Sequence, residues 1–107
     1  MAPRAQRRDR LVKVVDERIT VRCASGTKGT ARFETWEDSE GNVVRYNLAF
    51  VHHLISQIDH GRVLGYDNAH GYHERHHKGQ ASVVTFNSFA KTLARFLAEV
   101  DEFRTNN

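Results

Sequence analysis

The sequence contains few of the residues that build disulfide frameworks, membrane spans or secretory signals. Its 107 residues include one cysteine, one proline, one methionine and one tryptophan. A single cysteine, Cys23, cannot form an intramolecular disulfide, which agrees with a reducing, cytoplasmic location. No apolar run approaches the ~18 residues that span a bilayer, so no membrane partner is expected.

The first ten residues are basic and hold no apolar segment, so they do not predict a secretory signal. We expect residues 1–10 to form a basic flexible arm. The remaining length suits one modest core, predicted as a single α+β domain over residues 11–104. A hydrophobic fraction of 39% and a charged fraction of 27% are typical of a soluble globular protein. The net charge of +3 favours a polyanionic partner such as RNA.

Short segments in which apolar and polar residues alternate predict an antiparallel sheet. Four to five strands are expected, at about residues 11–23, 31–36, 43–53, 62–66 and 81–85. Asp16 and Glu17 are a candidate bend inside the first of these segments. The apolar spacing of residues 54–58 fits either a strand or a short helix.

The apolar spacing changes to steps of three and four near the end of the chain, where it predicts an amphipathic helix of about five turns. Its apolar stripe runs from Phe86 to Phe103, and Thr85 or Asn87 is the expected N-cap. Packing this helix on one face of the sheet buries both apolar surfaces. A stripe this wide can also receive a segment of a partner or a second subunit, so a homodimer is possible.

One polar stretch, residues 65–79, has a composition that no core requires. It holds four of the seven histidines, between His70 and His77, together with carboxylates and cations. Imidazole changes its charge near neutral pH and also ligates metals, so this stretch is the candidate functional site. We expect it to form a histidine-rich loop that the sheet and helix hold in place.

Four features in this order resemble the TumE-type toxin family of prokaryotic toxin–antitoxin modules. They are the strand at residues 45–50, the element at residues 61–68 that ends Tyr-Asp-Asn, a His- and Arg-rich loop that closes on a glycine, and an amphipathic helix ending at residues 96–100. The family's loop tends to end Asp-His-Arg-His. His77 matches a family histidine directly, whereas Arg75 and His76 have exchanged places. The resemblance implies a small cytoplasmic toxin that a cognate antitoxin protein restrains.

The first hypothesis for the chemistry is cleavage of RNA without a cofactor. It needs a base for the 2′-hydroxyl proton, an acid for the leaving oxygen and cations for the phosphate. The candidate catalytic residues are imidazoles and carboxylates of the loop: His73, His76, His77, Glu74 and Asp67. The candidate substrate-binding residues are cations and tyrosines of the loop and its flanking strands: Arg62, Tyr66, Tyr72, Arg75, Lys78 and Arg45.

Two alternatives stay open. In the first, His73 and either His76 or His77 bind a divalent metal ion. The further ligand is Asp67, Glu74 or His70. The protein would then be a metal-dependent nuclease or phosphodiesterase. The loop can also bind nucleic acid or a partner protein without catalysis, through its cations and tyrosines. Individual residues also have structural explanations, such as an Asx turn at Asp67 and burial of Cys23.

Overall fold

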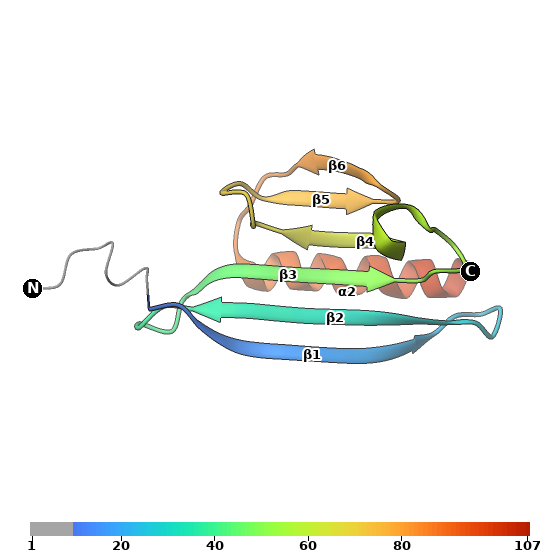
Figure 1. The fold of residues 1–107 in the computed structure, drawn as a ribbon, viewed down its shortest axis with the longest axis horizontal. Helices are drawn as coiled ribbons and strands as arrows, with labels where there is room; N and C mark the ends of the chain where they lie inside the picture. Colours follow the sequence, from blue (N-terminus) through green and yellow to red (C-terminus); the bar gives the residue numbers. More distant parts are fainter. Residues whose placement is uncertain (1–9) are drawn as a thin grey trace, which may run out of the picture.

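Six antiparallel strands form one sheet in the order of the sequence, and one long helix lies against it (Figure 1). This computed structural model describes residues 10–107, so the predicted arm falls almost wholly outside the described residues. The strands are β1 Val12–Arg22, β2 Lys28–Glu37, β3 Val43–Val51, β4 Arg62–Asp67, β5 Glu74–His77 and β6 Gln80–Val83. The α+β fold with a C-terminal helix is confirmed.

The sheet has one strand more than the upper number expected, because part of the histidine-rich stretch is a strand and not a loop. β5 pairs with β4, with Tyr66 opposite Arg75 and Gly65 opposite His76. Lys78 and Gly79 then form a two-residue turn into β6, with positive φ angles of 47° and 86°. These angles are typical of the hairpin turn that matches the twist of a β-ribbon. A tight turn and backbone pairing therefore override a polar composition that suggested a loop.

The first strand is continuous, so the bend expected at Asp16 and Glu17 is wrong. Both residues pair directly with β2, and the irregularity is a bulge between Lys13 and Val15. Residues 54–57 belong to neither a strand nor a helix. They form turns that lead into η1, a short 3-10 segment at Ile58–Gly61.

Helix α2 spans Phe89–Asn106 and packs against β3 and β4. Its N-cap is Ser88 and not Thr85 or Asn87, because the Ser88 hydroxyl accepts a 3.1 Å hydrogen bond from the Lys91 amide. Phe86 precedes the helix. The 18 residues of α2 make five turns, as the spacing predicted.

The core lies between the helix and the middle of the sheet. Phe96 meets Phe33 edge to face at 5.7 Å between ring centroids, and Phe103 meets Phe50 at 5.5 Å. Cys23 is buried, as predicted. The side of the sheet that carries these contacts is called the helix face below.

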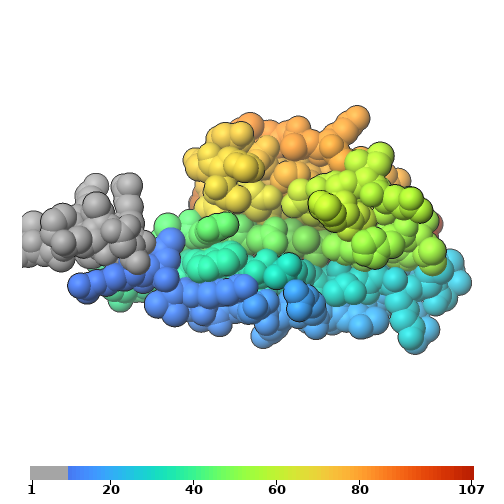
Figure 2. All heavy atoms as spheres, in the orientation of Figure 1, coloured from blue at the N-terminus to red at the C-terminus, as the bar shows by residue number. Residues whose placement is uncertain are grey.

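The opposite side of the sheet is called the open face. Figure 2 views the molecule from this side, and α2 is almost wholly hidden behind the strands. Successive side chains of a strand point to opposite faces, so Glu34, Asn47, Asp67 and Glu74 lie in one registered row across the open face. Glu34 and Asp67 are buried although no helix covers them. Packing of the hydrophobic core does not require this row of polar side chains on the open face.

Candidate functional site

Strand β5 divides the predicted site residues between the two faces of the sheet. Arg75 and His77 point to the helix face, whereas Glu74 and His76 point to the open face. His73 precedes the strand and lies on the helix-face side, against Tyr46. The three imidazoles therefore do not converge on one point, and two separate groups of polar side chains result.

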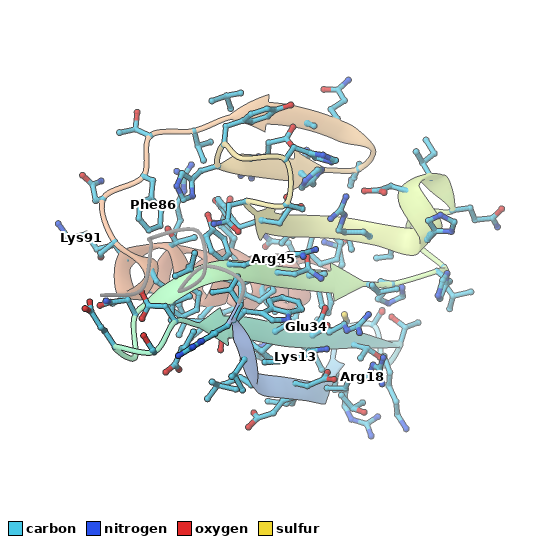
Figure 3. The ribbon with its side chains drawn as sticks, turned by 60° about the vertical axis from the view of Figure 1, so that its left-hand side comes forward. Lys13, Arg18, Glu34, Arg45, Phe86 and Lys91 are labelled. Atoms are coloured by element: carbon cyan, nitrogen blue, oxygen red, sulfur yellow. The ribbon has the colours of Figure 1, made fainter. Side chains whose placement is uncertain are left out.

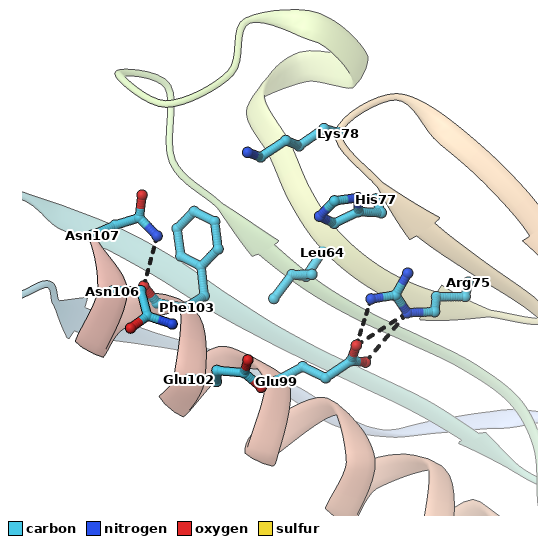
Figure 4. A pocket seen from close by; sticks show the side chains of 9 residues that line it. All are labelled: Leu64, Arg75, His77, Lys78, Glu99, Glu102, Phe103, Asn106 and Asn107. Carbon is cyan, nitrogen blue, oxygen red and sulfur yellow. Dashed lines mark hydrogen bonds and ion pairs between the residues drawn. The ribbon is translucent and has the colours of Figure 1, made fainter.

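The first group lines a cleft between the β4–β5 ribbon and the C-terminal half of α2 (Figure 4). Its volume is about 230 Å³. His77 and Lys78 reach into it from the sheet side, and the helix contributes Glu99 and Glu102 opposite them (Figure 4). The cleft is called the helix-side cleft below.

An ion pair holds one wall of this cleft in place. Arg75 donates from Nε to Glu99 Oε2 at 3.1 Å and to the Tyr66 hydroxyl at 3.2 Å, and from Nη2 to Glu99. Tyr66 in turn donates to Glu99. Burial and the hydrogen bond to Glu99 raise the pKa of Tyr66 to about 12, so its hydroxyl stays protonated. Burial alone would raise the pKa of Glu99, but the hydrogen bonds from Arg75 and Tyr66 outweigh it and hold that pKa below its usual 4.5.

His77 and Lys78 are unpaired basic groups of the cleft, which Glu102 faces from the helix. Within residues 10–107, neither side chain makes a hydrogen bond or ion pair, and both residues are exposed. Lys78 is also held in the left-handed backbone region, where a residue other than glycine or asparagine is strained. An unpaired imidazole and an unpaired ammonium group beside an anchored guanidinium can receive a phosphate.

His73 lies near the opposite end of the hairpin in a more apolar setting. The buried Tyr46 hydroxyl contacts His73 Nδ1 at 2.7 Å, and the Phe86 ring stacks on the imidazole at 3.9 Å. Burial raises the pKa of Tyr46 to about 12, so its hydroxyl stays protonated. Burial also lowers the pKa of His73 below its usual 6.5, which keeps the ring neutral at pH 7.

The second group is a hydrogen-bonded network on the open face, centred on Arg62. Its guanidinium donates to Asp59 Oδ2 at 2.7 Å and to Asp67 Oδ2 at 3.5 Å, and its Nη2 lies 3.1 Å from His76 Nδ1. His76 Nε2 lies 2.8 Å from Asp67 Oδ2. Gly65 makes this possible, because a Cβ there would lie 2.9 Å from Arg62 Cδ.

This network also contains the candidate metal ligands. Asp67, Glu74 and His76 place one ligand atom each within 4.8 Å of one another. Arg62 can only donate, so the geometry assigns His76 Nδ1 as an acceptor and places its proton on Nε2, facing Asp67. A metal ion on Nε2 would need that proton removed and a proton on Nδ1, which Arg62 opposes. The three residues fit a metal ion only if Arg62 moves away.

The two remaining predicted residues make no hydrogen bond or ion pair with either group within residues 10–107. Tyr72 is 48% exposed in the loop between β4 and β5 and lies near His70. Arg45 is on the open face, with its guanidinium carbon 4.8 Å from the centre of the Trp36 ring. No helix within residues 10–107 is long and apolar enough to cross a membrane.

The comparison with family sequence models decides the identity. The sequence model described as Toxin TumE matches residues 3–104. The chain belongs to the TumE toxin family. The resemblance noted in the sequence is thereby confirmed, and the family places the protein in a toxin–antitoxin module. Neither a curated protein nor a solved structure matches the chain.

The Tyr-Asp-Asn element is one of the features that carry the resemblance to the TumE family. It has a structural role at the end of β4. Asp67 Oδ1 accepts a 3.2 Å hydrogen bond from the Ala69 amide, which is the expected Asx turn. Asn68 accepts from the Tyr46 amide and donates to the Val44 carbonyl, so its side chain continues the pairing with β3. The element therefore fixes how the chain of this TumE toxin leaves the sheet.

Several site residues of this TumE toxin were missed in the sequence. Glu99 and Glu102 were not among the predicted site residues, although Glu99 lies three residues after Phe96 and so borders the buried stripe. Gly65 interrupts a strand between two large apolar residues, which signals a close approach of another group. Tyr46 offered no signal, because a tyrosine in a buried strand is ordinary.

Proposed function

We propose that this TumE toxin cleaves single-stranded RNA in the helix-side cleft, with His77 as the general base. The supporting observation is the juxtaposition of an unpaired imidazole and an unpaired ammonium group, His77 and Lys78, with the anchored guanidinium of Arg75 in one cleft. Metal-free cleavage of RNA needs these three chemical groups around one phosphate. The positive net charge agrees with a polyanionic substrate.

The proposed step is an internal phosphoryl transfer. His77 takes the proton of the 2′-hydroxyl, and the 2′-oxygen forms a bond to phosphorus. The bond from phosphorus to the 5′-oxygen breaks, and the Lys78 ammonium supplies the proton that the leaving oxygen requires. Arg75 stabilises the charge that builds on the phosphate oxygens. The products are a 2′,3′-cyclic phosphate and a free 5′-hydroxyl.

The first test compares growth inhibition by the wild type, His77→Ala and His70→Ala in a bacterial host. His70 is an exposed histidine of the β4–β5 loop and serves as the matched control. His77→Ala should abolish growth inhibition and RNA degradation, because the base is lost, whereas His70→Ala should keep both. Equal toxicity of all three proteins without RNA degradation would replace the catalytic proposal by a non-catalytic binding function.

The second test addresses the chemistry directly with purified protein and a short single-stranded RNA. Once the cleaved position is known, a matched RNA with one 2′-deoxy sugar at that position should resist cleavage. The products of the unmodified RNA should carry cyclic phosphate ends. Cleavage of the 2′-deoxy RNA would exclude the proposed step.

A metal-dependent phosphodiesterase is the second candidate, favoured by the approach of Asp67, Glu74 and His76 on the open face. This candidate predicts that a chelator abolishes activity and that Glu74→Gln does the same. The metal-free proposal predicts that neither change matters. Activity of the chelated protein and of Glu74→Gln therefore separates the two candidates.

We also propose a cognate antitoxin protein as the partner, which the family supports. Co-expression with the product of the neighbouring reading frame should relieve growth inhibition. A stable complex of the two purified proteins is expected. Unchanged toxicity on co-expression of each adjacent gene would contradict this proposal.

A further inference from the structure

The outer edge of the sheet at β1 can pair with a strand of another chain. β1 is an edge strand, since within residues 10–107 it pairs only with β2. It is 11 residues long, whereas β6 at the other edge of the sheet has four. A long exposed edge presents a row of unpaired backbone N–H and C=O groups, and an extended segment of a partner can bind there by adding a strand.

The hydrogen-bonding pattern of the β1–β2 hairpin identifies the backbone groups that point outward. The Cys23 amide donates to the Thr27 carbonyl at 2.8 Å, where the chain turns into β2. In an antiparallel pair, residues that bond to the partner strand alternate with residues that do not. The pairing is regular from residue 16 to residue 22. The outward N–H and C=O groups therefore belong to Asp16, Arg18, Thr20 and Arg22.

The open face of this hairpin places cations opposite one another. Arg18 lies opposite Arg32 in the register, and Arg22 lies opposite Lys28. Like charges directly opposite each other destabilise a sheet. Arg32 pairs with Glu34 at 3.1 Å, but the other three cations are exposed and make no hydrogen bond or ion pair within residues 10–107. An acidic partner would offset these charges, which the chain itself leaves uncompensated.

The other face of β1 borders an apolar groove between this strand and α2, with a volume of about 370 Å³. Ile19 on the strand and Leu97 on the helix line it, and they are 50% and 48% exposed. Side chains of a strand alternate between the two faces of its sheet. A strand added beside β1 would therefore direct every second side chain to the groove and the others toward Arg18 and Arg22.

We infer that the antitoxin of this TumE toxin binds the outer edge of β1 through an extended segment in which apolar and acidic residues alternate. The inference rests on the proposed antitoxin partner and not on the proposed cleavage. The segment becomes a seventh strand of the sheet. Its apolar side chains enter the groove, and its carboxylates meet Arg18 and Arg22. Helix α2 separates the groove from the helix-side cleft, so this contact anchors the antitoxin without filling the cleft.

Two other occupants match this edge less well. A second copy of the chain would bring the same excess of cations, because the open face of β1 carries Lys13, Arg18 and Arg22 but one carboxylate. That carboxylate, Asp16, already pairs with Lys13 at 2.9 Å. The phosphates of RNA would meet the arginines but would leave the apolar groove empty. The charges and the groove together therefore favour an acidic, amphipathic strand.

Hydrogen exchange of the complex tests the inference. The probe is the product of the neighbouring reading frame, bound to the full chain. In the free toxin the outward amides of Arg18 and Thr20 should exchange rapidly, and in the complex they should exchange at least about tenfold more slowly. Val83 is the control, because the same alternation turns its amide outward at the β6 edge, and its rate should not change. Unchanged exchange of Arg18 and Thr20 would overturn the inference.

Variants of β1 test the contact by affinity. Thr20→Pro removes one outward N–H without breaking the pairing with β2, so it should weaken antitoxin binding about tenfold. Thr20→Val keeps the N–H and should bind like the wild type. Arg18→Glu should also weaken binding about tenfold, whereas Lys91→Glu should not. Figure 3 shows Arg18 on β1 at the outer edge of the sheet and Lys91 at the start of α2, far from it.

Equal antitoxin affinity of Thr20→Pro and the wild type would overturn the inference. If Thr20→Pro does not fold, the comparison of Arg18→Glu with Lys91→Glu decides. A free toxin that is a dimer, and that Thr20→Pro converts to a monomer, would assign the edge to a second copy. Loss of RNA binding in Arg18→Glu, with antitoxin binding intact in both β1 variants, would assign the cations to RNA. Either result would replace the inference.

The outcomes also separate this inference from the proposals on which the function rests. An antitoxin that binds the wild type and every β1 variant equally would sink only the inference. The absence of a binding partner among the products of the adjacent genes would sink the proposed antitoxin and the inference together. His77→Ala should bind the antitoxin as tightly as the wild type, because His77 lies in the helix-side cleft. Failure of the cleavage tests therefore leaves the inference intact.

Discussion

The hydrogen-bonded network around Arg62 depends on the absence of a side chain at Gly65. Its stem crosses the open face over Gly65, and its guanidinium then reaches both Asp67 and His76. Asp59 also accepts a hydrogen bond from the Arg62 guanidinium. It lies in a segment in which Asp59 and His60 both have φ angles of 54°. The left-handed backbone at Asp59 has a cost, and the hydrogen bond to Arg62 offsets it.

Gly65→Ala should destabilise the protein by about 1–3 kcal/mol, because the new methyl group would displace Arg62 or push against the Leu48 carbonyl 3.0 Å away. Denaturant unfolding of the variant measures the loss. In an Arg62→Ala background the same substitution should cost less, since one of its two clashes is gone. An equal cost in both backgrounds would mean that Arg62 is not what Gly65 accommodates.

Glu99 should make stability depend on pH in the acid range. Its pKa is lower in the folded protein than its usual 4.5, so its ionised form stabilises the fold. This contribution is present above pH 4.5 and is lost as the pH falls through the folded-state pKa. The free energy of unfolding should therefore fall on acidification, and less steeply in Glu99→Gln. Glu102→Gln is the control, because Glu102 makes no ion pair within residues 10–107, and it should keep the wild-type slope.

At the scale of elements, the β5–β6 hairpin carries the candidate chemistry on its turn. Backbone pairing to β4 fixes the alternation that sends His77 to the cleft and His76 to the open face. The turn itself uses Lys78, although asparagine is the residue that tight turns of this kind favour before a glycine. A strained lysine at this position is consistent with a functional role for its side chain.

Lys78→Asn separates stability from activity. Asparagine tolerates the φ of 47° better than lysine, so the variant should be more stable by up to about 1 kcal/mol in thermal or denaturant unfolding. RNA cleavage should nevertheless fall, because the ammonium group is lost. Lys78→Gln is the control, since it loses the charge but keeps the strain, and it should lose activity without gaining stability. A more stable and fully active Lys78→Asn protein would remove Lys78 from the proposed site.

For the whole molecule, the helix divides the helix face of the sheet into two grooves. On one side lies the polar cleft beside β5. On the other lies an apolar groove beside the edge strand β1, of about 370 Å³, bordered by Ile19 and Leu97, each about half exposed. The polar side therefore carries the basic residues of the proposed site, together with Glu99 and Glu102.

The affinity for single-stranded RNA should fall as salt rises, because bound phosphates release counterions. Removing one phosphate contact with Lys78→Gln should reduce the slope of log affinity against log salt by about 0.7. Arg104→Gln is the matched control, since Arg104 already pairs with Asp101 at 2.7 Å. It should leave the slope unchanged, and an equal reduction in both variants would indicate binding by diffuse charge alone.

Much of the fold was determined by local patterns in the sequence. The period of two predicted the hairpin of β2 and β3, and the steps of three and four predicted α2, because burying one face of each element requires that spacing. The order of apolar segments and glycines also carried the resemblance to the TumE toxin family.

Tertiary structure alone decided how the polar residues group. Nothing local indicates that β5 forms a strand, and forming it moves every second side chain to the other face, so His76 and His77 are separated although they are neighbours in the chain. Glu99 reaches Arg75 across 24 residues, and Asn47 reaches Glu34 across the β2–β3 ladder. Such contacts depend on strand register and on where the helix lies, which are properties of the packed sheet and not of any segment.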